Sequence, residues 1–351
     1  MTKSIILGDL HFGVNQGSKE VFEIQMKFFE DQVFPYVKEN NIKTIFQLGD
    51  AFDNRSSTDN YIVNEVQRRI FDYTEKEGIT WHILLGNHDL FFKNSLSHSI
   101  LYLFNQAYSN INLYSKSTLL EFNNKTIQIE PWLLDNKLEI NKQSDVVLGH
   151  FEIVGFNVSK TYKATHGLGT EDIPKNVPIL SGHFHNKQLS GNIFYIGTPT
   201  QLSWSDFEEE KGFYVYDGDW NDLTFIENNE FKHLKVDLDI DTKEIVVNGF
   251  KTPLQLKYSK NMNLSIFKNN KVKLYAKKEL AIVKTFLEML KEVAYRVDLE
   301  ILKEVEDLDV DDIVEKVKGY DIEDSIIQVV DEDDRQVLSE VLHDAKELMK
   351  G

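Results

Sequence analysis

The sequence predicts an α/β protein built from stacked layers of strands and helices. Short β-rich apolar runs alternate with amphipathic helical patterns through the first two-thirds of the 351 residues, and this alternation is typical of α/β domains. Hydrophobic residues make up 41% of the chain, which is enough for a sizeable core. The length favours one large domain followed by one or two smaller ones.

Five short runs have the composition of buried strands. They are Ser4–Leu7, Thr44–Leu48, Trp81–Leu85, Asp145–Leu148 and Pro178–Leu180. Two amphipathic helices are expected between the first three runs, at Lys19–Glu39 and Tyr61–Lys76. Pro35 should kink or end the first helix because proline has no amide hydrogen. Gly78 should stop the second helix.

The rest of the chain predicts two smaller units. A strand pattern with turn signals continues from Phe194 to Val236. A strand at Val272–Tyr275, a helix at Leu280–Val293 and a strand at Arg296–Leu302 then form one small β-α-β unit. The last segment is helical, and its apolar residues recur on one stripe. The boundaries that we expect are 1–236, 237–306 and 307–351.

Charge and composition limit the possible classes of protein. The formal net charge is −18, which counts against binding to nucleic-acid phosphates. However, residues 307–351 hold 15 acidic and 5 basic residues, so a net of −10 lies in this segment alone. No cysteine is present, which excludes disulfides and thiolate metal sites. Neither a signal-peptide core nor an apolar run of about 18 residues occurs, so we expect a cytoplasmic protein without a membrane span.

Five polar motifs stand at the ends of the predicted strands. They are Asp9-Leu10-His11, Gly49-Asp50-Ala51-Phe52-Asp53, Gly86-Asn87-His88-Asp89, Gly149-His150 and Gly182-His183-Phe184-His185. In an α/β sheet the carboxyl ends of the strands meet at one crevice. We therefore expect these side chains to converge at one edge of the sheet.

The residue types in these motifs suit a pair of metal ions. Imidazole and carboxylate ligands without sulfur favour Mn, Fe or Zn. Asp9 and His11 are two residues apart, so in an extended segment both point the same way, and His183 and His185 repeat this spacing. The two oxygens of a carboxylate such as Asp50 can bridge two cations. Two cations about 3.5–4 Å apart can hold a hydroxide and clamp a phosphate.

Each motif alone is weak, because a histidine after a strand is usually structural. Five such motifs in series, each at a strand end, are a strong signal. The remaining histidines fit no such pattern, and we interpret them as structural or surface residues. They are His82, His98, His166, His233 and His343.

The five motifs resemble those of the calcineurin-like metallophosphoesterases. More narrowly, the chain resembles the SbcD-type DNA-repair nuclease subunits and the related phage recombination endonuclease subunits. This narrower resemblance adds Tyr195-Ile196-Gly197-Thr198-Pro199 and Glu210-Lys211-Gly212-Phe213, which look like that group's "pGSp…KGf" pattern. It implies a two-sheet metallophosphoesterase sandwich flanked by helices, with a small α/β cap and a C-terminal helical segment.

The resemblance also implies roles for individual residues and two divalent metal ions, with Mn²⁺ preferred. One metal would be bound by Asp9, His11, Asp50 and His185, and the other by Asp50, Asn87, His150 and His183. His88 would lie over the scissile phosphate, where it stabilises charge or protonates the leaving oxygen. Asp53 or Asp89 would orient His88, with Asp53 preferred, although some family members have histidine at the position of Asp53.

The implied activity is exonuclease or endonuclease cleavage of DNA in repair and recombination. Family members act with an SMC-like coiled-coil ATPase of the SbcC type, as a homodimer within a heterotetramer. A C-terminal helical segment docks on the ATPase, and here the apolar residues Ile322, Ile326, Ile327 and Val330, then Leu338 to Leu348, offer such faces. Glu65–Tyr73 and Asn94–Tyr102 are candidate dimer surfaces. If the protein is phage-encoded, it would act in the host cytoplasm.

Two other functions remain open at this point. The first is a stand-alone phosphatase or cyclic-nucleotide phosphodiesterase on the same fold. The protein-phosphatase branch typically has Asp-Arg-Gly after its second motif, whereas this chain has Asp53-Asn54-Arg55. The roughly 135 residues beyond the motif domain also favour the nuclease, because an enzyme for small substrates has less need of them. The second is a scaffold without activity, which the intact ligand set argues against.

Overall fold

The computed structural model describes residues 2–160 and 162–302. The predicted ATPase-binding segment, residues 307–351, and His343 lie outside the described residues. None of the described helices is long and apolar enough to cross a membrane.

The first sheet has six strands and contains the first three predicted ones. Its order is β12 (Thr224–Glu227), β11 (Gly212–Tyr216), β1 (Ser4–Leu7), β2 (Thr44–Gln47), β3 (Thr80–Leu84) and β4 (Ile111–Tyr114). Strands β1 to β4 are parallel, and β11 and β12 extend the sheet in antiparallel pairing. The carboxyl ends of β1, β2 and β3 therefore lie side by side.

The second sheet also has six strands. Its order is β5 (Thr118–Phe122), β6 (Lys125–Glu130), β7 (Val146–His150), β8 (Ile179–Gly182), β10 (Ile193–Tyr195) and β9 (Gln188–Ser190). Strands β6, β7, β8 and β10 are parallel, and the two edge strands are antiparallel. The predicted strands at Asp145–Leu148 and Pro178–Leu180 are β7 and β8.

The two sheets pack face to face around a shared apolar core. Ile6 and Phe46 of the first sheet pack with Leu148 and Leu180 of the second, and all four side chains are buried. Each such side chain contributes about 1.5–3 kcal/mol on burial. The predicted two-sheet sandwich of the fold class is confirmed.

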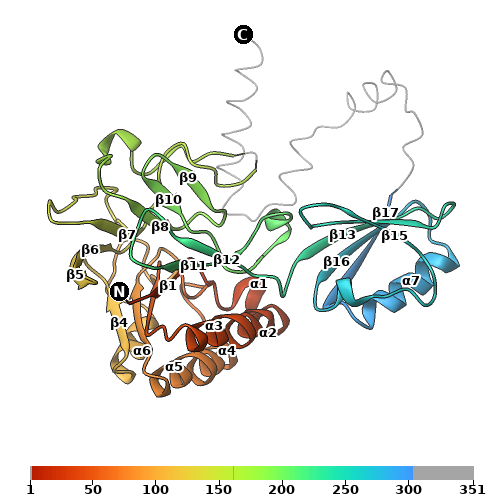
Figure 1. The fold of residues 1–351 in the computed structure, drawn as a ribbon, viewed down its shortest axis with the longest axis horizontal. Helices are drawn as coiled ribbons and strands as arrows, with labels where there is room; N and C mark the ends of the chain where they lie inside the picture. The colour runs from red at the N-terminus through yellow and green to blue at the C-terminus, as the bar shows by residue number, and fades with distance from the viewer. Residues whose placement is uncertain (1, 161, 303–351) are drawn as a thin grey trace, which may run out of the picture. The chain divides into compact units, whose positions relative to one another are not determined.

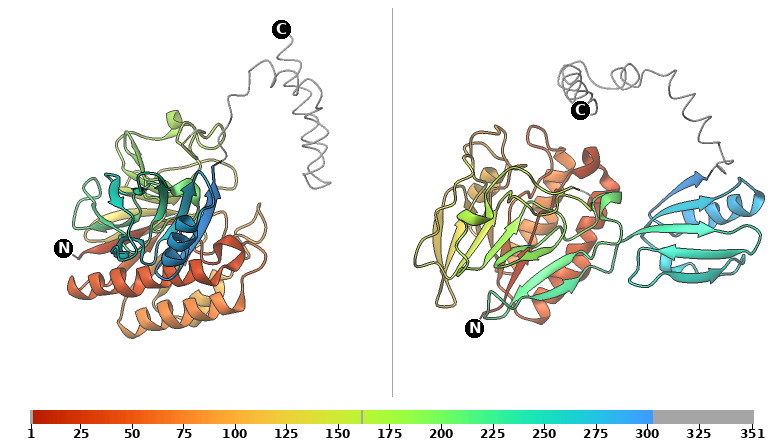
Figure 2. Two further views of the ribbon diagram at one scale, coloured as in Figure 1. Left: turned by 90° about the vertical axis from the view of Figure 1, so that its right-hand side faces the viewer. Right: turned by 90° about the horizontal axis from the view of Figure 1, so that it is seen from above.

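Helices cover the other face of the first sheet (Figures 1 and 2). Successive strand residues point to opposite faces, so Ile5 and Ile45 pack with Phe22 and Met26 in a second core. The helices are α1 (Val14–Gly17), α2 (Lys19–Phe28), α3 (Phe34–Glu39), α4 (Asn60–Val66), α5 (Asp72–Lys76) and α6 (Leu101–Ala107). Short 3-10 turns occur at Thr170–Asp172, Trp204–Asp206 and Ser265–Phe267.

Pro35 does not end the first predicted helix. A π-helical turn, Phe29–Val33, joins α2 to α3, and Pro35 lies in the first turn of α3. The amide of Phe34 donates to the carbonyl of Phe29, so the extra residue in this turn accommodates the proline without breaking the helix. A second π-helical turn, Gln67–Phe71, joins α4 to α5.

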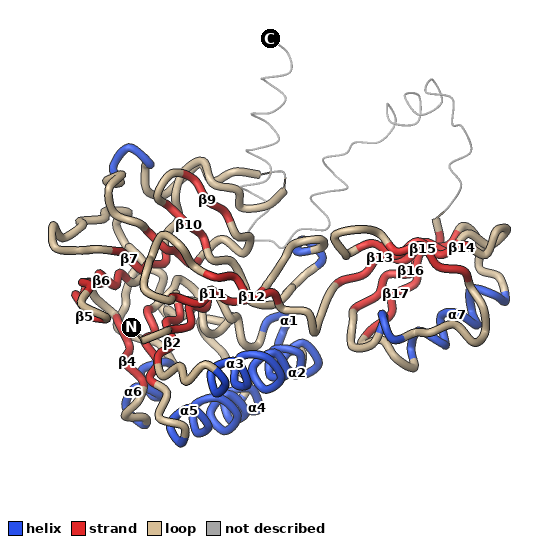
Figure 3. Tube along the Cα trace, in the orientation of Figure 1, coloured by secondary structure: helices blue, strands red, loops and turns tan. Residues whose placement is uncertain are grey.

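A third sheet with one helix follows the sandwich (Figure 3). Its order is β15 (Leu254–Lys257), β14 (Glu244–Asn248), β13 (His233–Leu238), β16 (Lys271–Ala276) and β17 (Arg296–Ile301). α7 (Ala281–Lys291) buries Val283 and Phe286 against this sheet. The predicted β-α-β unit is β16-α7-β17, with parallel strands. β13 begins at His233 and ends at Leu238, so it runs through the predicted domain boundary at 236/237. The position of that boundary stays a prediction.

Candidate metal centre

The predicted ligands converge, but from two sheets rather than from one edge of a single sheet. Asp9 and Asp50 follow β1 and β2 of the first sheet, whereas His150 ends β7 of the second and His183 follows β8. Both sheets present their carboxyl ends to the same place. The sequence motifs identified the strand ends, but pairing of two sheets depends on distant contacts that local patterns do not carry.

Glycines let the ligands approach one another closely. A Cβ atom on Gly86 would lie 2.2 Å from Asp50 Oδ1, and one on Gly49 would lie 2.4 Å from His150 Nδ1. Such contacts are far inside van der Waals distance, so only glycine fits. Three of the converging residues also have left-handed backbone conformations, with φ of 47° at His11, 53° at Asp50 and 92° at His183. Strain of this kind costs about 1–3 kcal/mol per residue and is typical of functional sites.

Asp9, His11 and His185 form the first group of possible ligands. His11 Nε2 lies 3.1 Å from His185 Nε2 and 3.9 Å from Asp9 Oδ2. The Asp9 and His11 side chains are fully buried or nearly so. Three ligand atoms that face one another in a largely buried group are the arrangement that a cation would satisfy.

Asp50, His150 and His183 form the second group, and Asn87 lies among them. Asn87 Oδ1 is 3.0 Å from His150 Nε2 and 3.1 Å from His183 Nδ1. The other ring nitrogen of His150 is 2.7 Å from the Leu48 carbonyl, so Nδ1 carries a proton for that contact and Nε2 faces the group. An amide oxygen, two imidazoles and a carboxylate fit a divalent metal.

One oxygen of Asp50 lies between the two groups. Asp50 Oδ2 is 3.8 Å from His11 Nε2 and 3.3 Å from His150 Nε2. Its other oxygen, Oδ1, accepts a hydrogen bond from the His88 amide at 2.7 Å. Asp50 is therefore fixed in place with one oxygen directed to ligands of both groups.

Burial and mutual charge set the pKa values of these groups in the metal-free protein. Burial lowers the pKa of His183 to about 3 and that of His185 to about 4, so both rings are neutral, as metal ligands must be. Burial also lowers the pKa of His150, but the Asp50 carboxylate and further neighbours outweigh it and raise this pKa to about 9. Burial opposes ionisation of Asp50, yet His150 and His11 hold its pKa far below the usual range. The charged His150 thus supplies the positive charge that a metal would bring to Asp50.

His88 lies beside the first group, with its ring centroid 4.8 Å from that of His11. Its Nδ1 is 2.6 Å from the backbone carbonyl of Asp53, so Nδ1 donates there and Nε2 remains for a substrate. The Asp53 carboxylate instead lies 3.2 Å from His11 Nδ1. Asp53 therefore contacts His88 through its backbone carbonyl, and its carboxylate contacts the predicted ligand His11.

Asp89 has a different role from the one considered in the sequence. Its carboxylate accepts hydrogen bonds from the backbone amides of Asp50 at 2.8 Å, Ala51 at 3.0 Å and Gly86 at 2.9 Å. Burial and the nearby Asp50 raise the pKa of Asp89 to about 7. The carboxylate has no oxygen left for His88 and instead holds the two loops that carry Asp50 and Asn87.

Comparisons with known proteins agree with this geometry. Residues 2–187 match the family described as calcineurin-like phosphoesterase. The chain belongs to the calcineurin-like phosphoesterase family. It is also 33% identical over 240 residues to "Exonuclease subunit 1" of Enterobacteria phage T4, an alignment that covers 67% of this chain and 70% of that protein. The phosphoesterase is therefore a hydrolase whose family uses divalent metals.

Sequence reasoning missed the residues that support the predicted ligands of this phosphoesterase. Trp132 packs its ring against His150 and His183, with centroids 5.9 and 5.2 Å apart. The buried Gln47 donates to the carbonyl of Gly49 in the loop that carries Asp50. Neither residue forms part of a strand-end motif, so no spacing signal marks them.

Lys211 is the clearest of these supporting residues. Its ammonium group is buried and lies 2.9 Å from the buried Asp206 carboxylate. It also donates to the backbone carbonyl of His185 at 2.6 Å, which additionally accepts from the Thr198 amide at 3.0 Å. Lys211 thus holds the segment that carries a predicted ligand. Lys211 and Thr198 belong to the two stretches that resemble the nuclease pattern. The sequence pattern therefore contained these two residues, but only the structure shows that they hold the His185 carbonyl.

Lys211→Met is expected to weaken metal binding as well as folding. The change leaves the Asp206 carboxylate buried without its positively charged partner, which should cost about 3–5 kcal/mol of unfolding free energy, measured by urea denaturation. Loss of the contact to His185 should weaken metal affinity about 10–100-fold, measured by titration calorimetry.

A double variant separates these two effects. Asp206→Asn with Lys211→Met removes the unpaired charge and should regain most of the stability, but not the metal affinity. Lys187→Met is the matched control, because the partly exposed ion pair of Lys187 with Glu210 does not contact the centre. Metal affinity that is unchanged in Lys211→Met would contradict the positioning role.

The remaining described histidines behave as structural or surface residues. His82 stacks on Phe46 and lies 2.7 Å from the Tyr114 hydroxyl. His233 is buried with its Nδ1 2.8 Å from Gln201 Oε1. His98 and His166 are exposed and lie outside the ligand groups.

Proposed function

We propose that this phosphoesterase is a two-metal nuclease that hydrolyses phosphodiester bonds in DNA. The observation that carries the proposal is the position of Asp50 Oδ2 between the two ligand groups. A shared carboxylate suits two adjacent cations better than two separate sites. The likeness to a protein named as an exonuclease subunit supports DNA as the substrate.

The residues divide into two ligand sets that share Asp50. The first set would be Asp9, His11, Asp50 and His185, and the second Asp50, Asn87, His150 and His183. When bound, two divalent ions supply Lewis-acid activation of a water and neutralise the charge of the phosphate. The mixture of imidazole and oxygen ligands without sulfur suits Mn²⁺. The protein itself fixes the distance between the two sets through Asp50.

His88 would act on the phosphate rather than bind metal. Its Nδ1 donates to the Asp53 carbonyl, which fixes the ring and leaves Nε2 outside that contact. From this position Nε2 can donate a hydrogen bond to a phosphate oxygen or a proton to the leaving oxygen. Asp53 positions both His88 and His11, because its backbone contacts one and its carboxylate the other.

Substrate comparison with manganese tests the function directly. The purified protein is incubated with Mn²⁺ and a linear duplex, a short single-stranded DNA, p-nitrophenyl phosphate or a cyclic nucleotide. Cleavage of DNA that EDTA abolishes and Mn²⁺ restores supports the nuclease. Rapid turnover of the small substrates without DNA cleavage, alone or with a coiled-coil ATPase, would instead establish the phosphatase or cyclic-nucleotide phosphodiesterase.

We further propose that the protein acts with an SMC-like ATPase of the SbcC type, as a homodimer in a heterotetramer. The partner would supply the positive surface for DNA that this acidic chain lacks. The acidic segment of residues 307–351 would bury its apolar faces on the coiled coil. The described sheets end at Ile301, before this segment begins.

Truncation after Glu306 should separate catalysis from assembly. The shortened protein should keep its metal content and its cleavage of a short DNA, but no longer co-purify with the ATPase. Elemental analysis, a nuclease assay and pull-down measure these outcomes. Lost metal or solubility would show that the tail belongs to the core, and unchanged co-purification would place the docking site elsewhere.

A further inference from the structure

A cleft of about 740 Å³ opens beside His88 and is lined mainly by apolar groups. Phe91 and Phe92 follow His88 by three and four residues, and their side chains are 49% and 47% exposed. Their ring centroids are 4.7 Å apart at an interplanar angle of 83°. Two half-exposed rings on one short loop are costly to leave in water, so they indicate a surface that another group covers.

The loop that carries these rings is held in place. The Phe91 amide donates to the His98 carbonyl at 3.0 Å, and the Phe92 ring packs edge-on against His98, with centroids 5.4 Å apart. The hydroxyl of Tyr102 donates to the Leu96 carbonyl at 2.6 Å. The rings are therefore presented by an ordered loop, which lowers the entropic cost of binding.

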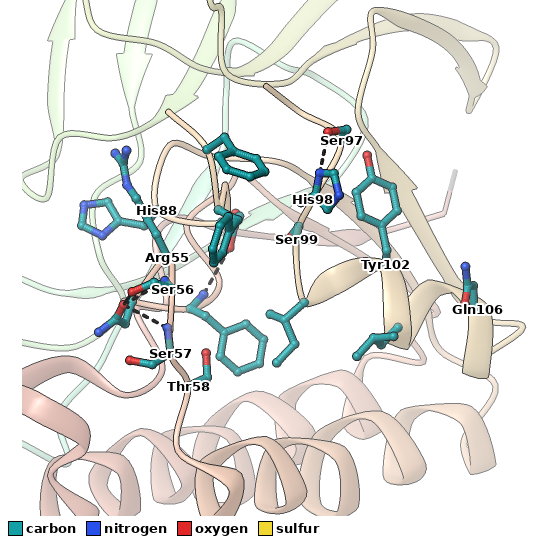
Figure 4. Close-up of a pocket in the computed structure, with 17 residues that line it drawn as sticks. Arg55, Ser56, Ser57, Thr58, His88, Ser97, His98, Ser99, Tyr102 and Gln106 are labelled. Carbon is teal, nitrogen blue, oxygen red and sulfur yellow. Dashed lines mark hydrogen bonds between the residues drawn. The ribbon is translucent and has the colours of Figure 1, made fainter. Parts of the chain in front are cut away.

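Arg55 adds a positive charge at the same cleft. Figure 4 shows Arg55 beside His88, with His98 and Tyr102 further along. Arg68 and Arg69 form ion pairs with glutamates, whereas Arg55 forms none with the described residues. In a chain with a net charge of −18, an arginine without an acidic partner next to His88 fits an anionic ligand.

We propose that this cleft is a nucleotide subsite, in which the Phe91 and Phe92 rings stack on an unpaired base while Arg55 contacts a phosphate next to the cleaved one. The inference rests on the proposed nuclease function and adds a substrate preference to it. Aromatic rings bind bases of any sequence, because every base has a π face. A base can reach the rings only when it is out of the duplex, so the subsite selects single-stranded or frayed DNA near the cleaved bond.

An abasic substrate tests this stacking contact. Short single-stranded DNAs that carry one abasic nucleotide, placed in turn on either side of the cleaved bond, are incubated with the full-length protein and Mn²⁺. At one position, wild-type kcat/KM should fall about five- to 150-fold, the loss expected for one stacked base. In Phe91→Ala/Phe92→Ala the intact DNA should already be cleaved that slowly, and the abasic nucleotide should cause little further loss.

Two further variants sharpen the test. Leu103→Ala is the matched control, because Leu103 lines the same cleft, is 65% exposed and has no ring, and it should keep the full abasic penalty. Arg55→Gln should reduce the slope of log affinity against log salt by about 0.7, the change expected for one lost phosphate contact on single-stranded DNA.

The outcomes distinguish the two proposals. Failure of the wild-type protein to cleave any DNA, alone or with a coiled-coil ATPase, would overturn the nuclease function, and the subsite with it. Cleavage with no abasic effect at any position, or with the same effect in Phe91→Ala/Phe92→Ala, would overturn the subsite alone. If that double variant keeps the penalty but changes mass in analytical ultracentrifugation, the cleft is an interface with a second copy of the chain, and the subsite is wrong.

Discussion

Asp50→Asn is expected to release both metal ions and to reduce phosphodiester hydrolysis to background. The substituted side chain would keep the shape of the aspartate and its contact with the His88 amide, but its amide group lacks the charge that two cations share through Oδ2. The loss should exceed the roughly 10²–10⁴-fold expected for one acid–base residue, because both ions leave. Elemental analysis after dialysis against Mn²⁺ and a cleavage assay measure the two effects.

The control for Asp50→Asn is Glu130→Gln. Glu130 is also a buried carboxylate, but it contacts Ser117 and Gln128 in the second sheet rather than the ligand groups. This variant should retain its metal and its activity. Circular dichroism should show that both variants are folded. Two retained equivalents of metal in Asp50→Asn would refute the bridging role.

His88→Ala should have the opposite pattern, with metal kept and turnover lost. The ring contacts the Asp53 carbonyl through Nδ1 and leaves Nε2 for the substrate. Loss of one positioned proton donor or charge stabiliser lowers kcat about 10²–10⁴-fold. The measurement is single-turnover cleavage at saturating Mn²⁺, together with metal content.

His166→Ala is the control for His88→Ala, because His166 is an exposed histidine that lies outside the ligand groups. It should retain most of the turnover. Near-normal turnover of His88→Ala would show that the assigned role is wrong. Loss of metal would show that His88 is a ligand, as its closeness to His11 and Asp53 also allows.

Local sequence was sufficient for the strands that lead to the site. β1, β2, β3, β7 and β8 are short, fully or largely buried, and rich in β-branched or aromatic residues. Each is followed or ended by polar residues that an apolar core alone would not accommodate. A sharp change from apolar to polar residues is a local signal. The same few residues therefore predicted both the end of the strand and the polar motif that follows it.

Some strands at the edges of the sheets could not be predicted from the sequence. β5 and β15 alternate half-buried with exposed residues, and β9 has three residues with none buried. They lie at or near sheet edges, where one face or one side meets water, so their composition resembles that of loops. Only hydrogen bonding to the neighbouring strand makes these segments strands.

By itself, the sequence determined which residue types gather for metal chemistry, because ligand type and strand-end position are local properties. Only the tertiary structure decided which role each of these residues has. Asp89 anchors backbone amides instead of orienting His88, Asp50 lies between two groups, and Lys211 supports His185. These roles depend on atoms that are brought within about 3–4 Å by two sheets packing together, and such distances are a property of the folded chain rather than of any segment within it.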